Sequence, residues 1–101
     1  MLYGISDKNL EIINSIFKKY QGINKVFLYG SRAKGNYRIG SDIDLALEIN
    51  SLFNNNDLLK IAGDFDDSII PHLVDVLIYD KINNLDLKAH IDRVGKIIYQ
   101  C

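Results

Sequence analysis

The sequence predicts a small α+β or α/β layer fold, in which helices cover one face of a short sheet. Three observations support it. Apolar residues recur at helical spacing between residues 6 and 22, alternate with polar residues between 42 and 49, and form an almost continuous run over 72–79. A chain of 101 residues is long enough for one hydrophobic core, so a single domain over residues 1–101 is expected.

Apolar spacing predicts three helices. The first begins after Ser6, a residue type favoured at helix N-caps. The second follows the asparagine-rich loop of residues 54–56. The last starts near Asn84 or Asp86 and stops at Gly95, where a glycine ends the helical pattern.

Three strands are predicted between these helices. Residues 26–29 form a short apolar run bounded by glycines, and Pro71 marks the entry to the strand over 72–79. In the strand over 42–49, one face is apolar and the other carries Asp42, Asp44, Ala46 and Glu48. The predicted order is therefore helix, strand, turn, strand, helix, strand, helix.

The composition excludes several classes of function. The formal net charge is −1, so no overall positive field exists and direct binding to nucleic acid is not expected. Cys101 is the only cysteine, which excludes an intrachain disulfide. The apolar runs are too short to cross a bilayer and no signal-peptide pattern is present, so we expect a cytoplasmic protein without a membrane partner.

Asp42 and Asp44 form the first candidate for a site. A strand repeats every two residues, so both carboxylates lie on one face and their oxygens can converge on a cation. Two adjacent anions repel each other, and a hard divalent ion such as Mg²⁺ relieves that repulsion. The alternative interpretation of such a pair is a solvated strand face or a turn.

The segment after the first strand is the second candidate. Gly30 and Ser31 follow the buried strand directly, where a glycine lets the backbone approach a ligand and a hydroxyl adds a donor. Arg32, Lys34 and Arg38 then supply local positive charge that suits a triphosphate. The alternatives are an ordinary strand-to-helix turn and a solvated basic loop.

Asp75 is the third candidate, because it interrupts the apolar strand over 72–79. A carboxylate buried in so apolar a strand needs a partner. It forms a salt bridge, ends the strand with a hydrogen bond, or acts as a third ligand beside Asp42 and Asp44. His72 points away from Asp75 on a strand, and His90 is interpreted as a surface residue of the last helix.

These residues together resemble a known family. Gly30-Ser31, ten further residues and then Asp42-x-Asp44 resemble the signature of the polymerase-β-type nucleotidyltransferase superfamily. The longer string GSRAKGNYRIGSDIDLAL resembles its smallest branch, the MNT-domain proteins, and the resemblance extends to Tyr99. It implies an α+β nucleotidyltransferase fold with a short mixed sheet and helices packed on one face. Lys34 stands where many members carry arginine, and it lacks the bidentate fork of that side chain.

The resemblance also implies a site and a substrate. The implied catalytic and metal-binding carboxylates, which would hold two Mg²⁺ ions, are Asp42, Asp44 and Asp75. The implied nucleotide-binding residues are Gly30, Ser31, Arg32 and Lys34. ATP would be the substrate, and Asp75 would help to deprotonate the acceptor hydroxyl.

The resemblance implies a biological partner as well. MNT-domain proteins are commonly antitoxins of HEPN-type ribonuclease toxins, and known cases transfer AMP from ATP to a toxin tyrosine. Two alternatives remain. One is a non-catalytic antitoxin that neutralises the toxin by binding, and the other is a small-molecule nucleotidyltransferase that works as a homodimer. Either a homo-oligomer or a hetero-oligomer with the toxin is compatible with these roles.

Overall fold

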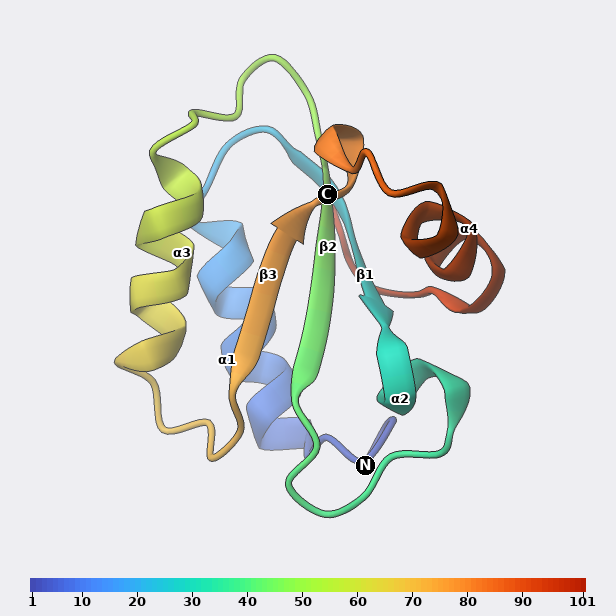
Figure 1. Cartoon of the computed structure of the whole chain (residues 1–101). Helices are drawn as coiled ribbons and strands as arrows, with labels where there is room; N and C mark the ends of the chain where they lie inside the picture. The colour runs from blue at the N-terminus through green and yellow to red at the C-terminus, as the bar shows by residue number, and fades with distance from the viewer.

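A single four-stranded sheet with the order β3-β2-β1-β4 forms the centre of the protein (Figure 1). The computed structural model describes all residues from 1 to 101. The strands are β1 (Ile23–Tyr29), β2 (Ile43–Ile49), β3 (Val74–Ile78) and β4 (Lys96–Gln100). β1 is antiparallel to β2 and to β4, whereas β2 and β3 are parallel, so the sheet is mixed as predicted.

Helices connect the strands, and their ends follow from local sequence. They are α1 (Asp7–Lys18), α2 (Gly30–Lys34), α3 (Asp57–Asp66) and α4 (Leu85–Val94), with a 3₁₀ turn η1 (Tyr79–Lys81) after β3. Ser6 caps α1, because its hydroxyl accepts a hydrogen bond from the Asn9 amide at 3.1 Å. Asn84 caps α4 in the same way, through the Leu87 amide at 3.1 Å. Both predicted helix starts are confirmed.

The hydrophobic core lies between one face of the sheet and helices α1 and α3. Alternate residues of β2 are fully buried on this face, namely Ile43, Leu45 and Leu47. The rings of Phe17 on α1 and Phe65 on α3 meet edge to face at 5.6 Å between centroids. Each fully buried Leu, Ile or Phe side chain contributes roughly 1.5–3 kcal/mol, so this face supplies most of the apolar stabilisation.

The other face of the sheet is partly covered by α4, which differs from the predicted one-sided layer. Tyr29 and Leu28 are neighbours on β1 and therefore point to opposite faces. Leu28 belongs to the core, while the Tyr29 ring meets His90 of α4 edge-on at 6.2 Å. The predicted arrangement thus describes α1 and α3, and α4 lies across the sheet from them (Figure 1).

The C-terminal segment differs from the prediction too. The predicted order ends with the last helix, but residues 96–100 after it form the edge strand β4 against β1. Five residues carry too little local signal for a strand, and long-range pairing with β1 stabilises this one. The longest helix, α1, has 12 residues, and none of the helices combines the length and hydrophobicity needed to span a bilayer.

Candidate active site

Asp44 and Asp75 lie side by side on neighbouring strands. They are register partners in the parallel pair of β2 and β3, so both side chains project from the same face of the sheet. That face is opposite to the buried residues Ile43 and Leu45, which flank Asp44 along β2. Asp42 directly precedes β2, two residues before Asp44. The fold therefore gathers carboxylates from segments about thirty residues apart.

The expected burial of Asp75 is wrong. β3 forms an edge of the sheet, and the Asp75 side chain is exposed. Water solvates it there, so an apolar strand does not force this carboxylate to find a salt-bridge partner. What remains at this position is an accessible carboxylate directly beside Asp44.

The carboxylates influence one another electrostatically. Burial raises the pKa of Asp44 above its ordinary value, and the negative charges of Asp75 and Asp42 raise this pKa further. Arg32 opposes them and lowers it. Burial raises the pKa of the neighbouring Tyr29 to about 12, again with help from the charges of Asp44 and Asp75. The site therefore concentrates negative charge that a bound cation would relieve.

The chemistry of these donors fits a hard divalent ion. Carboxylate oxygens are the ligands that Mg²⁺ takes in proteins, and two of them already share one patch of surface at Asp44 and Asp75. The structure contains no group of three or more His, Cys, Asp or Glu side chains arranged to hold a metal. The two Mg²⁺ ions therefore stay a prediction. Asp42 precedes β2 and is the one carboxylate of the three that has no register partner among the others.

Gly30 lies against Asp44 at the end of β1. Its φ is +75°, in the left-handed region that favours glycine, and a Cβ added at this position would collide with Asp44 Oδ2. The Gly30 amide donates a hydrogen bond to His90 Nε2 at 3.1 Å. Only glycine allows the start of α2 to approach the carboxylate so closely.

Arg32 is buried, which the prediction of a phosphate-contacting side chain did not anticipate. Only 2% of its surface is exposed. Its guanidinium donates to the Ser41 carbonyl at 2.7 Å and to the Tyr3 carbonyl at 3.1 Å. It also stacks near the Tyr37 ring, 5.4 Å from the centroid. These contacts indicate that Arg32 fastens α2 to the loop before β2 and to the N-terminal segment.

Ser31 and Lys34 occupy the same short helix. Ser31 is half-buried on α2 directly after Gly30, and Lys34 is exposed in its last turn. The two ion pairs of the structure, Met1 with Asp7 and Lys19 with Asp64, leave Lys34 without an acidic partner. Lys34 is therefore an accessible cation on the short helix that begins at Gly30, in contrast to the buried Arg32.

His90 is the residue of this region that the sequence did not reveal. It was expected at the surface, yet it is partly buried between Tyr29 and Gly30. The expectation is wrong because His90 and Gly30 are 60 residues apart in the chain. No local spacing connects a histidine on the last helix with the end of the first strand.

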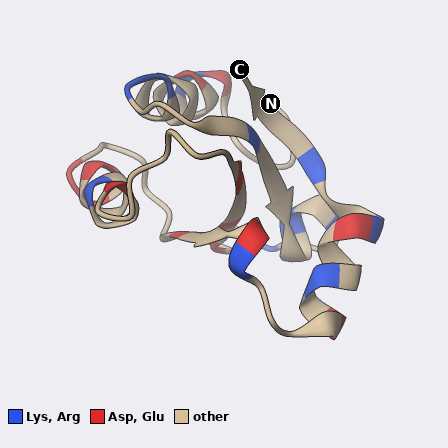
Figure 2. Cartoon of the chain, turned by 90° about the horizontal axis from the view of Figure 1, so that it is seen from above, with Lys and Arg blue, Asp and Glu red and all other residues tan.

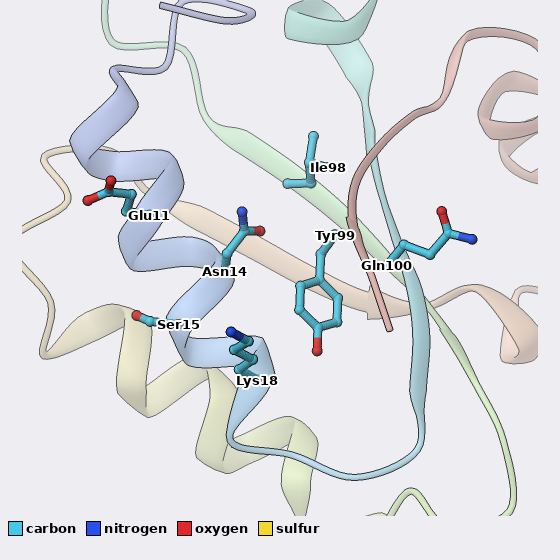
Figure 3. Close-up of a pocket in the computed structure, with 7 residues that line it drawn as sticks. All are labelled: Glu11, Asn14, Ser15, Lys18, Ile98, Tyr99 and Gln100. Atoms are coloured by element: carbon cyan, nitrogen blue, oxygen red, sulfur yellow. The ribbon is translucent and has the colours of Figure 1, made fainter.

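Asp42 and Asp75 are exposed and Asp44 is half-buried, and all three lie outside the pockets of the molecule. None of the four pockets is lined by Asp42, Asp44 or Asp75. The pocket in Figure 3, of about 420 Å³, lies between α1 and β4 and is lined by residues such as Asn14 and Tyr99. Acidic and basic residues are interspersed along the helices (Figure 2), in keeping with the formal net charge of −1. Any preference for a charged ligand is therefore local.

Comparison with solved structures shows which proteins share this fold. A crystal structure of a toxin–antitoxin with AMP-PNP matches with 20% identity and a TM-score of 0.74, over 92% of this chain and 74% of that one. The toxin–antitoxin MntA-HepT matches with 18% identity and a TM-score of 0.70, over 95% and 74%. A tri-AMPylated Shewanella oneidensis HEPN toxin in complex with MNT antitoxin matches with 19% identity and a TM-score of 0.62, over 90% and 71%.

Comparison of the sequence itself gives the family. No curated protein matches the chain. Residues 11–101 match the family model described as polymerase beta, nucleotidyltransferase. That match includes β1, α2, β2 and β3, and with them the glycine-serine turn and all three carboxylates. This chain therefore belongs to the polymerase-β nucleotidyltransferase family.

Proposed function

We propose that this protein transfers AMP from ATP to a hydroxyl group, expected to be a tyrosine, of a HEPN-type ribonuclease toxin and thereby acts as its antitoxin. Family membership supports nucleotidyl transfer as the class of reaction. The toxin as acceptor is supported by the similar structures, two of which contain an MNT or MntA protein together with a HEPN or HepT protein. ATP as the donor is supported by the similar structure with AMP-PNP.

One observation carries the proposal. Asp44 and Asp75 are register partners on one face of the sheet, and Gly30 lies in contact with the same Asp44 carboxylate. A phosphate-binding turn and paired carboxylates are the parts that nucleotidyl transfer needs next to each other. An antitoxin that acted only by binding would gain nothing from keeping these mutually repelling charges together.

The chain's own residues have distinct roles in this proposal. Gly30 and Ser31 hold the terminal phosphates of ATP, Ser31 through its hydroxyl, and Lys34 neutralises phosphate charge from its exposed position. Asp75 is accessible at the edge of the sheet, where it helps to take the proton from the acceptor hydroxyl. Arg32 acts indirectly, because its contacts hold the loop that leads to Asp42.

Two Mg²⁺ ions would be held by Asp42, Asp44 and Asp75, and when bound they would acidify the acceptor hydroxyl and stabilise the departing pyrophosphate. Asp44 and Asp75 present their carboxylates together for this purpose. Asp42 is exposed and directly precedes β2, two residues before Asp44.

The test is a labelling experiment with α-³²P-ATP, Mg²⁺ and the product of the neighbouring gene. We expect label on that neighbour, and we expect its loss in Asp42→Asn and in Asp44→Asn. Asp66→Asn provides a matched control, because Asp66 is an exposed aspartate at the end of α3, away from the carboxylate face. This variant should label the neighbour at the wild-type rate.

Other outcomes would contradict the proposal in recognisable ways. Tight binding to the neighbour without label, unchanged in both variants, identifies an antitoxin that acts by binding alone. Label that appears only on an added small molecule identifies a small-molecule nucleotidyltransferase. Equal labelling by wild type and Asp44→Asn would show that the Asp44 carboxylate is not needed for the transfer.

A further inference from the structure

His90 contacts the glycine-serine turn from the far end of the chain. Its Nε2 accepts a hydrogen bond from the Gly30 amide at 3.1 Å, and its ring meets Tyr29 edge-on at 6.2 Å between centroids. An imidazole nitrogen that accepts a hydrogen bond carries no proton, so the proton of the neutral ring is on Nδ1. His90 is thus held as one tautomer against the backbone of Gly30.

The position of His90 is fixed by the anchoring of α4. Ile91, the next residue, is buried, with 2% of its surface exposed. The Tyr79 hydroxyl donates a hydrogen bond to Asp92 Oδ1 at 2.5 Å, and the Lys88 ammonium lies 5.1 Å from the centre of the Tyr79 ring. These contacts fall on both sides of His90 along the helix, so the helix is anchored around the residue that reaches Gly30.

Gly30 is consequently fixed from two directions. Asp44 Oδ2 lies so close that a Cβ on Gly30 would collide with it, and His90 Nε2 accepts a hydrogen bond from the Gly30 amide. A peptide unit held at both points has little freedom to rotate, and the next peptide carries Ser31. The orientation of Ser31 therefore depends on the His90 contact with the Gly30 amide.

We propose that His90 is a positioning residue of the nucleotide site, which orients Gly30 and Ser31 towards the ATP phosphates by accepting a hydrogen bond from the Gly30 amide. This inference rests on the proposed function, since it names a residue that serves the same site. His90 touches neither ATP nor the acceptor in this role and acts through Gly30. The essential property of its side chain is the acceptor atom on the Gly30 amide, and the aromatic contact with Tyr29 is secondary.

Two substitutions separate these properties. His90→Phe keeps an aromatic ring against Tyr29 but removes the acceptor, whereas His90→Gln keeps an acceptor at the end of a side chain of similar reach. Arg93→Gln serves as a control on the same helix, because Arg93 is exposed. All four proteins are compared by thermal unfolding, so that a loss of fold is recognised before binding is interpreted.

The first measurement is equilibrium binding of ATP with Mg²⁺ to the full chain. We expect His90→Phe to raise the Kd about three- to tenfold, the effect of losing one neutral hydrogen bond that orders a site. The Kd of His90→Gln should stay within about twofold of the wild-type Kd, and the Kd of Arg93→Gln should equal the wild-type value. Unchanged or tighter binding by His90→Phe, or equal weakening in the Phe and Gln variants, would overturn the inference.

The second measurement does not depend on ATP. In the nitrogen NMR spectrum of the free protein we expect His90 to show the Nδ1-protonated tautomer, and the Gly30 amide resonance to shift in His90→Phe but much less in His90→Gln. A solvent-exchanging Gly30 amide, insensitive to His90, would refute the inference even if the chain transfers AMP. If wild type neither binds ATP nor transfers AMP, the proposed function fails while the NMR result still reports on the contact.

Discussion

Gly30 and Arg32 are two residues apart, and each is restricted by a different neighbour. Gly30 has no room for a side chain because Asp44 Oδ2 lies against its Cα. Arg32 has no freedom because its guanidinium donates to the carbonyls of Ser41 and Tyr3. One residue therefore permits a close approach to a carboxylate, and the other stabilises the loop that precedes it.

Gly30→Ala should destabilise the protein. An alanine at φ +75° is strained by about 1–2 kcal/mol, and the added Cβ also displaces Asp44. We expect the free energy of unfolding in urea to fall by at least that amount, with loss of AMP transfer. Gly63→Ala is the matched control, since a Cβ there meets no atom and alanine favours the helix by about 0.5–1 kcal/mol. Equal changes in unfolding free energy for Gly30→Ala and Gly63→Ala would show that position 30 does not require a glycine.

Arg32→Lys should also lower stability, although it keeps the charge. Lysine lacks the planar guanidinium that donates to the carbonyls of both Ser41 and Tyr3, so at least one half-buried carbonyl loses its donor. We expect a loss of about 2 kcal/mol in urea unfolding. Lys34→Ala, a change at an exposed site on the same helix, should stay within about 0.5 kcal/mol. A larger loss of unfolding free energy in Lys34→Ala than in Arg32→Lys would contradict the structural role assigned to Arg32.

At the scale of elements, helices α1 and α3 are joined by a polar link beside their apolar contact. The Tyr20 hydroxyl, just after α1, donates to Asp64 Oδ2 on α3, and Lys19 forms an ion pair with the same carboxylate at 3.0 Å. The hydrogen bond from Tyr20, followed by that from Lys19, lowers the pKa of Asp64. Burial and this hydrogen bond raise the pKa of Tyr20 to about 12.

The link between α1 and α3 predicts a pH-dependent stability. The native pKa of Asp64 is below its ordinary value of 3.8, so its contribution is complete above that pH and is lost as pH falls through the native pKa. The native pKa of Tyr20 is above 10.0, so its contribution is complete below that pH and is lost as pH rises towards 12. Urea unfolding should show the largest difference between wild type and Tyr20→Phe near pH 7 and a smaller one at pH 2.5. A difference in stability between wild type and Tyr20→Phe that did not change with pH would show that Tyr20 stabilises the protein through packing and not through its hydrogen bond to Asp64.

At the scale of the whole molecule, the order of strands brings the carboxylates together. β2 and β3 are parallel neighbours joined by α3, and this crossover sets Asp75 against Asp44. On the same face, α4 contributes His90 to the end of β1. The candidate site is thus made of residues from the first, middle and last thirds of the chain.

Asp44→Asn should increase the stability of the metal-free protein while removing its response to Mg²⁺. Burial and the charges of Asp75 and Asp42 all disfavour the ionised form of Asp44. A neutral asparagine amide at this position removes both the buried charge and the repulsion. Mg²⁺ that binds only the native state should raise the Tm of wild type, by the equivalent of about 2.7 kcal/mol at a hundred times its Kd. Thermal unfolding with and without Mg²⁺ tests both parts, with Asp66→Asn as the control. An Asp44→Asn protein that keeps the full Mg²⁺ response would exclude Asp44 as a ligand.

Most of the fold was predictable from periodicity, and the exceptions share a cause. The cap at Ser6, the start of the last helix near Asn84 and the alternation along β2 are local signals, and each was predicted correctly. β4 was missed because a five-residue strand depends on pairing with β1 for its stability. Asp75 was expected to be buried because apolar neighbours along a strand do not reveal that the strand lies at an edge.

The sequence by itself determined which residue types meet each face of each element. The spacing of Ile43, Asp44 and Leu45 separates core from site wherever the strand lies, because a strand's side chains must alternate. The tertiary structure alone decided the register of Asp44 with Asp75, the burial of Arg32 and the contact of His90 with Gly30. Each of these depends on how separate elements pack, and packing is set by the combined shapes of many side chains that no short stretch of sequence contains.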